Sequence, residues 1–176
     1  NKKILDLGCG PGFYSKLLYE KSAKVKAIDL SKTLIKLAKK QAPNVEFKIG
    51  DITKKLPYKN KEFDIVLASL VLGHLESWDS VLKEINRVLK KNGIFIFSNY
   101  NPVTEKTEKQ KWFFKTFRVI EGYFNEGPRT KIWTPETKKF PKELELNVMH
   151  YHKTYGTIVR LLVKHGFEII DYEDSK

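Results

Sequence analysis

The chain has 176 residues, 41% of them hydrophobic and 31% charged, which fits a single globular domain with a buried core. No apolar run reaches the roughly 20 residues of a membrane-spanning helix, and the one cysteine, Cys9, excludes an internal disulfide and favours a reducing, cytoplasmic setting. The net charge of +12 raises the question of a nucleic-acid partner, but the basic residues are almost all scattered lysines, whereas bidentate phosphate contacts favour arginine.

Strand-like and helical runs alternate from the start of the chain. A strand is expected at Lys3–Leu7 and a helix at Gly12–Lys21. A second strand is expected at Lys24–Asp29, followed by a helix that Ser31 caps. Pro43 prevents this second helix from continuing, because proline has no backbone N–H to donate.

The alternation continues as far as residue 98. Strands are expected at Val45–Ile49, Phe63–Leu70 and Gly93–Ser98. Ser77 is expected to cap the intervening helix, and the pair Asn92-Gly93 to end it in a left-handed conformation. This spacing predicts a doubly wound α/β fold, in which helices cover both faces of a mostly parallel sheet.

Residues 100–152 break the alternation. They hold four of the seven prolines and show no clean helical or strand period. They also contain 10 of the 22 aromatic residues, and aromatic walls suit a concave apolar pocket. We therefore expect an insertion above the sheet between the fifth strand and the last helix.

The remaining residues are expected to rejoin the sheet. A helix is expected at Thr154–Lys164, and a sixth strand at Phe167–Tyr172. We interpret 1–176 as one domain, with a core at 1–99, the insertion at 100–152 and a C-terminal helix and strand at 153–176. Because the chain enters its first strand almost at once, we expect it to be truncated at the N-terminus.

A glycine-rich turn follows the first strand. It reads Asp6-Leu-Gly-Cys-Gly-Pro-Gly12-Phe13, with glycines at alternate positions where Cβ atoms would obstruct a ligand. The dinucleotide fingerprint needs a third glycine where Phe13 stands, and the lysine of a phosphate-binding P-loop is missing. The turn therefore favours a nucleoside ligand without phosphates.

Two more acidic residues follow the next two strands. Asp29 ends the second strand, where a carboxylate can accept hydrogen bonds from both hydroxyls of a ribose. Asp51 follows the third strand and can accept from an adenine amino group, while the N–H of Ile52 donates to the ring. Because ligands of such sheets bind beyond the carboxyl ends of the strands, the three acidic residues predict one adenosine site.

The motifs ILDLGCGPGFYS, VKAIDLS, GDI, FDIVLASLVLGHL and INRVLKKNGIFIFS resemble, in order and spacing, those of class I S-adenosylmethionine (SAM)-dependent methyltransferases. The resemblance is to the small-molecule branch typified by enzymes of quinone biosynthesis, and it implies a Rossmann-like fold. It also implies that SAM binds and leaves as S-adenosylhomocysteine. The cofactor-binding residues that it implies are Asp6, Gly8, Gly10, Gly12, Tyr14, Asp29, Leu30, Asp51, Ile52 and Ser69.

The resemblance extends more loosely to the insertion and to the end of the fourth strand. Residues 123–129 and 151–154 resemble the lid that covers the methyl donor and forms much of the acceptor pocket in this branch. Arg87 to Gly93 match a structural motif, departing from the family at Lys91-Asn92. The resemblance implies a small-molecule methyl acceptor of apolar or aromatic character. No metal-ligand spacing is present in the sequence.

Two histidines are candidates for a general base. His74 follows the fourth strand, near the expected position of the methyl group, and His152 stands where the insertion rejoins the fold. His150 is set aside, on the expectation that it points the other way. Cys9 is interpreted as a small packing residue.

Two other functions remain open at this stage. The basic surface is compatible with an RNA-modifying methyltransferase or an RNA-binding protein, and the cofactor motifs alone are compatible with a non-catalytic SAM-binding module. The pattern indicates nothing about oligomeric state.

Overall fold

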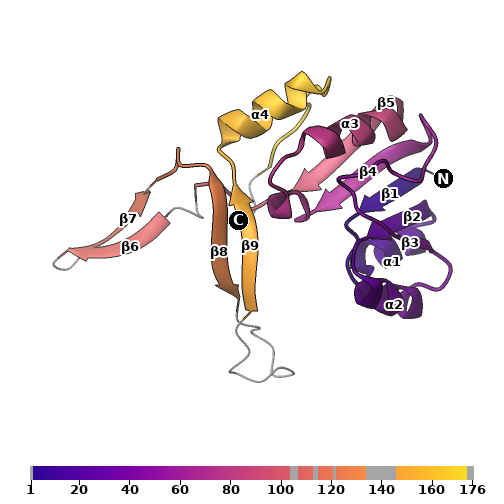
Figure 1. Cartoon of the computed structure of the whole chain (residues 1–176), viewed down its shortest axis with the longest axis horizontal. Helices are drawn as coiled ribbons and strands as arrows, with labels where there is room; N and C mark the ends of the chain where they lie inside the picture. The colour runs from indigo at the N-terminus through magenta and orange to yellow at the C-terminus, as the bar shows by residue number, and fades with distance from the viewer. Residues whose placement is uncertain (1, 104–106, 113–114, 121, 134–145, 174–176) are drawn as a thin grey trace.

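A computed structural model describes residues 2–103, 107–112, 115–120, 122–133 and 146–173. Its centre is a five-stranded sheet in which all paired strands are parallel, in the order β3-β2-β1-β4-β5 (Figure 1). The strand order reverses at β1, so β1 and its neighbours form the topological switch point at which such sheets bind ligands. The strands are β1 Lys3–Leu7, β2 Lys24–Asp29, β3 Glu46–Ile49, β4 Phe63–Ser69 and β5 Leu89–Ser98.

Helices cover both faces of this sheet, which confirms the predicted doubly wound α/β fold (Figure 1). On one face, α1 and α2 pack over a small core that includes Val25, Ala38 and Phe47. On the other, α3 and α4 pack over a larger core centred on Phe63 and Trp78. The helices are α1 Phe13–Glu20, α2 Lys32–Gln41, α3 Asp79–Val88 and α4 Tyr155–Lys164.

The predicted ends of the third helix were wrong in two respects. The N-cap residue of α3 is Trp78 rather than Ser77, although the Ser77 hydroxyl still accepts a hydrogen bond from the N–H of Asp79 at 3.3 Å. The helix ends at Val88, because Leu89 already has extended backbone angles and pairs with Phe63. Asn92 does adopt a positive φ of 61°, but within a β5 bulge rather than at a helix end.

The insertion contains two antiparallel hairpins that the sequence pattern did not predict. One pairs β6 (Thr107–Trp112) with β7 (Lys115–Ile120), and the other pairs β8 (Gly127–Trp133) with β9 (Leu146–His152). Both extend beyond the carboxyl ends of β4 and β5 (Figure 1). The second hairpin packs at its base against a short 3-10 helix, η1, which follows β4 at Leu72–His74.

The prediction of a sixth strand at Phe167–Tyr172 was wrong, because residues 167–173 form no strand. A strand requires a neighbour for its backbone hydrogen bonds, and these residues pair with none of the described strands. Phe167 still packs against Phe95 of β5 at a ring separation of 5.4 Å, whereas Ile170 is 75% exposed. None of the helices in the described ranges is both long and apolar enough to cross a lipid bilayer.

Candidate functional site

The glycine-rich turn between β1 and α1 combines two structural roles. Gly8, Gly10 and Gly12 all have positive φ, between 54° and 86°, a region that other residues rarely adopt. A Cβ atom on Gly8 would lie 2.4 Å from Val71, and one on Gly12 would lie 2.9 Å from Ala38. A Cβ on Gly10 would meet nothing within 4 Å. Gly10 therefore leaves its side of the turn open for a ligand, while Gly8 and Gly12 allow the chain to pack.

Asp29 ties this turn to the end of β2. One of its carboxylate oxygens accepts from the N–H of Gly10 at 2.8 Å, and the other accepts from the N–H of Ser31 at 2.8 Å. Each oxygen retains capacity for a further hydrogen bond. The carboxylate is thus held in one orientation beside the open face of Gly10, as a ribose-binding group must be.

Asp51 and Ile52 occupy the corresponding place after β3. The Asp51 Oδ1 atom accepts from both the hydroxyl and the N–H of Thr53, at 2.7 and 2.8 Å, and the hydroxyl bond lowers the pKa of the Asp51 carboxyl. Oδ2 accepts no bond from the described residues, so the ionised carboxylate can receive an amino group. The Ile52 side chain is buried, which holds the start of the loop against the core.

Asp6 lies behind the turn, not on its open side. The residue is 2% exposed, and its carboxyl accepts from the hydroxyl of Ser15 on α1 at 2.5 Å. Burial raises the pKa of Asp6 to about 6, despite the opposing effect of the Ser15 hydrogen bond. The structure therefore gives Asp6 a clear role in joining β1 to α1, and its predicted place beside the methionine half of the cofactor stays a prediction.

Apolar side chains are exposed around the same edge of the sheet. Tyr14 and Phe13 begin α1 and contact each other edge to face at 5.3 Å, with 43% and 65% of their surfaces exposed. Leu30, directly after Asp29, is 70% exposed. Ser69 ends β4, and its hydroxyl lies 3.1 Å from that of Ser98 on β5. The predicted cofactor residues thus gather after β1, β2, β3 and β4.

The chemistry of this edge fits a SAM-like ligand better than a nucleotide phosphate. Asp29 and Asp51 contribute acidic groups to this edge, and these favour a cationic sulfonium and disfavour a phosphate. The turn itself carries no lysine or arginine. Within the described ranges, no group of three histidine, cysteine, aspartate or glutamate side chains is placed to hold a metal ion.

His74 lies between the sheet and the insertion. Its Nδ1 atom is 2.9 Å from the carbonyl oxygen of Met149 on β9. A carbonyl can only accept, so Nδ1 carries the proton and the Nε2 atom of the neutral ring is a proton acceptor. The ring is exposed and lies edge-on to Tyr100, with 6.5 Å between centroids. This geometry is compatible with a general base.

His152 has a different environment. It is 1% exposed, and its Nε2 atom is 2.8 Å from the carbonyl oxygen of Tyr123. Such burial favours a role in holding the base of the second hairpin, and contact with a substrate stays a prediction. The expectation for His150 was wrong, since residues two apart in a strand share a face, and His150 is buried as well, next to Tyr100 at 5.4 Å.

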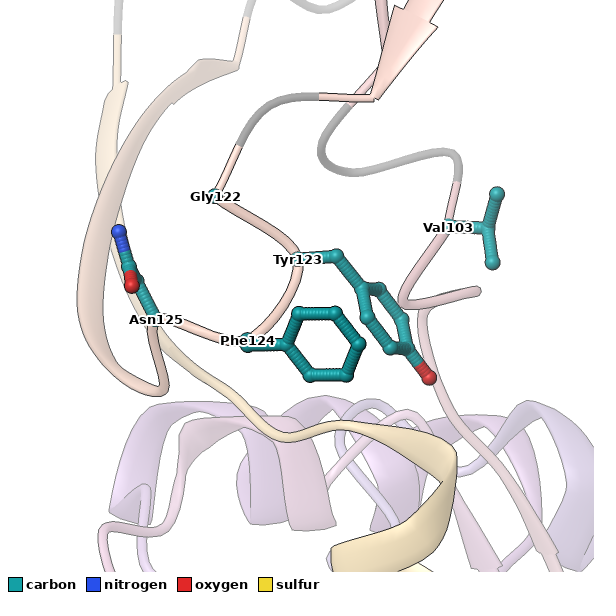
Figure 2. A pocket seen from close by; sticks show the side chains of 5 residues that line it. All are labelled: Val103, Gly122, Tyr123, Phe124 and Asn125. Carbon is teal, nitrogen blue, oxygen red and sulfur yellow. The ribbon is translucent and has the colours of Figure 1, made fainter.

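The insertion contains a cavity of about 500 Å³ lined by Val103, Gly122, Tyr123, Phe124 and Asn125. Figure 2 shows the rings of Tyr123 and Phe124 projecting side by side into this space. Phe124 is 85% exposed, an unusual position for a large apolar ring. Two of the aromatic residues that motivated the predicted acceptor pocket thus line this cavity, and its role as an acceptor pocket stays a prediction. Several of the other aromatic residues lie outside the described residues or have side chains that the structure does not describe.

Three hydroxyl side chains that contact the predicted site residues were not expected from the sequence. Ser15 donates to Asp6, Thr53 donates to Asp51, and Ser98 lies against Ser69. One of these could have been found, because a threonine two positions after an aspartate is the signature of a local side-chain turn. The other two depend on contacts between separate elements.

Comparisons with known proteins agree with this geometry. Residues 1–154 match a family described as a methyltransferase domain. The chain is 33% identical over 175 residues to a ubiquinone biosynthesis O-methyltransferase of Pelagibacter ubique, covering 97% of this chain and 68% of that protein. It is 38% identical over 116 residues to a malonyl-[acyl-carrier protein] O-methyltransferase of Legionella pneumophila, covering 63% of this chain but 40% of that enzyme.

A solved structure shares the same arrangement. A crystal structure of an S-adenosylmethionine dependent methyltransferase from Mesorhizobium loti superimposes with a TM-score of 0.77 at 26% identity, over 94% of this chain and 74% of that one. The match includes the insertion as well as the sheet, since the sheet and its helices alone make up a smaller share of the chain.

Proposed function

Because the chain belongs to the methyltransferase domain family, we propose that it transfers a methyl group from SAM to a small-molecule acceptor. Its Rossmann-like fold and its SAM cofactor agree with the comparisons. The observation that supports the proposal most strongly is the orientation of Asp29, whose two oxygens are fixed by Gly10 and Ser31 beside an open glycine. The acceptor and the catalytic residues are the parts that need testing.

We assign the cofactor contacts by position along the edge of the sheet. Asp29 would bind the ribose hydroxyls, and Asp51 with the N–H of Ile52 would bind the adenine. The open side of Gly10 would admit the methionine half. Tyr14 and Leu30 would cover the ligand with apolar surface, and burying such surface stabilises the complex. The full proposed set also includes Asp6, Gly8, Gly12 and Ser69.

The bound sulfonium supplies an activated methyl group for in-line displacement. The chain then has to hold the acceptor atom in line with the methyl carbon and to exclude water. For a hydroxyl acceptor, His74 would take the proton at Nε2, and the contact of its Nδ1 atom with the Met149 carbonyl oxygen supports this by leaving Nε2 available. We therefore favour His74 over the buried His152 as the general base.

We propose that the acceptor has an apolar or aromatic part that the insertion binds. The cavity beside Tyr123 and Phe124 supports this, since flat rings pack well against aromatic walls. The ubiquinone-biosynthesis relative aligns over 97% of this chain, so its alignment extends through the insertion. The alignment with the malonyl-carrier-protein enzyme covers 63% of the chain. A quinone-like phenol is therefore the preferred first acceptor to test.

Calorimetry with S-adenosylhomocysteine tests the cofactor assignment. We expect micromolar affinity, on the order of 8 kcal/mol. Asp29→Ala should weaken it about 100-fold, or roughly 3 kcal/mol for two hydrogen bonds to a charged group. Asp29→Asn keeps one acceptor oxygen, so its affinity for S-adenosylhomocysteine should lie between those of the wild type and Asp29→Ala. Equal affinity in all three proteins would refute the ribose assignment.

Turnover with a panel of acceptors tests the reaction. Phenolic quinone precursors should be methylated faster than malonyl thioesters, and His74→Gln should lower kcat for phenols by about 100-fold. Tight cofactor binding without turnover on any acceptor would instead favour a non-catalytic SAM-binding module.

An RNA acceptor is a second candidate because lysines line a hollow on the surface. A hollow of about 580 Å³ on the sheet side of the loop before β4 is rich in lysines, with Tyr58 and Glu62 also in its wall. RNA affinity that fell steeply with salt would favour this reading. The lysines that line the hollow are Lys3, Lys26, Lys48, Lys55 and Lys59.

A further inference from the structure

The connection between β3 and β4 starts with the proposed adenine contacts and contains no helix or strand. It begins after Ile49, includes Asp51 and Ile52, and reaches β4 at Phe63. A loop of this length has many alternative conformations, and holding one of them has an entropic cost. The adenine-binding segment therefore needs support from elsewhere in the fold.

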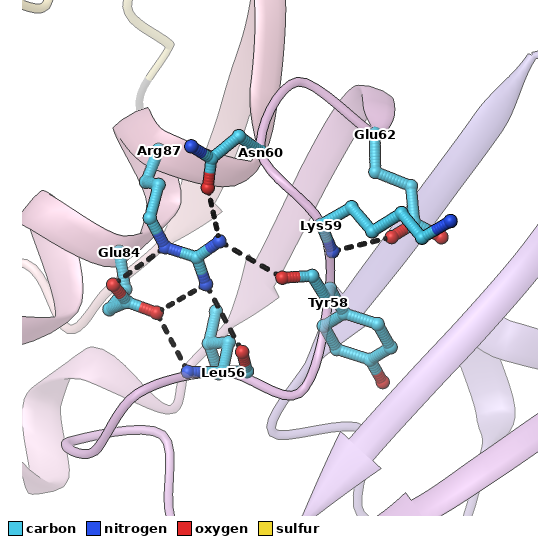
Figure 3. A network of polar contacts seen from close by, with 7 residues as sticks. All are labelled: Leu56, Tyr58, Lys59, Asn60, Glu62, Glu84 and Arg87. Carbon is cyan, nitrogen blue, oxygen red and sulfur yellow. Dashed lines mark hydrogen bonds and ion pairs between the residues drawn. The ribbon is translucent and has the colours of Figure 1, made fainter.

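Arg87 on α3 supplies such support through its guanidinium. It donates to the backbone carbonyl oxygens of Leu56 and Tyr58 at 3.1 and 2.9 Å, and to the side-chain oxygen of Asn60 at 2.8 Å. Figure 3 shows these three contacts converging from the loop on one side chain. A planar guanidinium with five fixed N–H groups can hold several acceptors at once, which an ammonium cannot do in the same geometry.

Glu84, one helical turn before Arg87, completes the network. Its two oxygens accept from Nε and Nη2 of Arg87 at 2.8 and 2.6 Å, and Oε2 also accepts from the N–H of Leu56 at 2.7 Å (Figure 3). The Arg87 bonds hold the pKa of Glu84 below its usual range. Both side chains are mostly buried, at 14% and 20% exposure, so solvent screens this pair less than a surface pair.

The network reaches Ile52 through the core. Ile52, Leu56 and Tyr58 belong to one buried cluster with the inner face of α3. Leu56 is 2% exposed and its N–H and carbonyl are both bound by the Glu84–Arg87 pair. Because Leu56 and Ile52 belong to the same loop and the same buried cluster, we expect a shift of Leu56 to be transmitted to Ile52, whose N–H is the proposed donor to the adenine ring.

We propose that Arg87, oriented by Glu84, is a positioning residue for adenine recognition in SAM binding. The proposal rests on the proposed function, since it assumes that Asp51 and Ile52 bind the adenine. It assigns to α3 a part in cofactor selectivity although neither of the two side chains is placed to touch the cofactor.

The test compares two ligands that differ only in the purine ring. S-adenosylhomocysteine presents an amino group to Asp51 and a bare ring nitrogen to Ile52, whereas S-inosylhomocysteine presents an oxygen and an N–H at those positions. The wild-type protein should prefer the adenosyl ligand by about 100-fold, because both contacts become unfavourable. Calorimetric affinities for both ligands give the preference as a ratio.

In Arg87→Lys and Glu84→Gln the ratio should fall about tenfold or more, with the affinity for the inosyl ligand little changed. Lys90→Met is the matched control, because Lys90 forms an ion pair with Asp64 at 2.8 Å between β5 and β4 without touching the loop. It should leave the ratio as in the wild type. Hydrogen exchange at the Thr53 and Lys54 amides should be faster in the two test variants only.

The outcomes separate the two proposals. A general loss of stability would lower both affinities together, so an unchanged ratio in Arg87→Lys and Glu84→Gln would overturn the positioning role. A wild-type protein that binds neither ligand would overturn the proposed function itself. A wild-type protein that binds both equally would overturn the adenine assignment on which Arg87 acts.

Discussion

The parallel sheet and the insertion differ in where their functional residues stand in the sequence. In the sheet, Asp29 is the last residue of β2 and Asp51 lies two residues after the end of β3, so local pattern locates them and topology brings them together. In the insertion, the residues that meet are distant, as when Gly127 pairs with His152. Local pattern is therefore informative for the residues proposed to bind the cofactor and weak for those proposed to bind the acceptor.

One glycine with a positive φ from each region can be compared, and the glycine of the sheet region should show the largest loss of folding stability. Gly12→Ala should destabilise the protein by about 2–5 kcal/mol, from roughly 1–2 for the left-handed backbone and 1–3 for the contact with Ala38. Gly127→Ala, which also has a positive φ of 132° but no atom near its Cβ, should cost about 1–3 kcal/mol. Urea unfolding measures both. A larger loss at Gly127 would reverse the comparison.

The buried carboxyl of Asp6, in the sheet, should make the free energy of unfolding depend on pH. Its pKa is raised to about 6, so the folded state binds more protons than the unfolded state between about pH 4 and 6, and the free energy of unfolding falls as pH rises through that window. The fall should total up to about 3 kcal/mol for two pKa units.

Asp6→Asn removes the titrating group but keeps an acceptor for Ser15. The difference in unfolding free energy between Asp6→Asn and wild type should therefore grow from pH 4 to pH 6 and be constant above pH 7. Denaturant titrations at a series of pH values check this, and a difference that stays flat through the window would show that Asp6 is already ionised in the folded protein.

In the insertion, a substitution at Phe124 should weaken acceptor binding and leave cofactor affinity unchanged. Phe124→Ala should raise KM for an aromatic acceptor about tenfold, near 1.4 kcal/mol, because a ring contact is lost. The affinity for S-adenosylhomocysteine should not change, since Phe124 is 85% exposed in the insertion and is not among the proposed cofactor contacts. Steady-state kinetics and calorimetry measure the two effects. An equal loss of both would mean that the insertion supports the cofactor site.

The smallest effect on folding stability is expected where the two regions join. Glu126 accepts from the hydroxyl and N–H of Thr154 at 2.6 and 2.8 Å, which links the start of β8 to the N-terminus of α4. Glu126→Gln should cost about 1–2 kcal/mol of stability, because two hydrogen bonds to a charged group are weakened. Glu168→Gln, on an exposed residue after α4, is the control and should stay within about 0.5 kcal/mol of wild type in a thermal melt.

How much of the site the sequence revealed differs from residue to residue. Asp29 and Asp51 were located correctly at strand ends, and the glycine pattern marked the turn. The burial of Asp6 was not predictable, because it depends on Ser15 of α1 folding back over the turn. The roles of Gly8 and Gly12 were also hidden, since the atoms that exclude their Cβ belong to Val71 and Ala38, distant in the sequence.

By itself, the sequence determined the order of strands and helices as far as residue 98, the parallel sheet and the edge where the cofactor is proposed to bind, because the strand and helix periods and the capping residues act within a few positions. Only the tertiary structure decided the pairing of the hairpins, the lack of strand pairing over residues 167–173 and the Glu84–Arg87 support of the loop before β4. The hairpins and the Glu84–Arg87 network require hydrogen bonds between residues that are far apart along the chain, and residues 167–173 find no described strand to pair with. No local pattern records which distant groups meet.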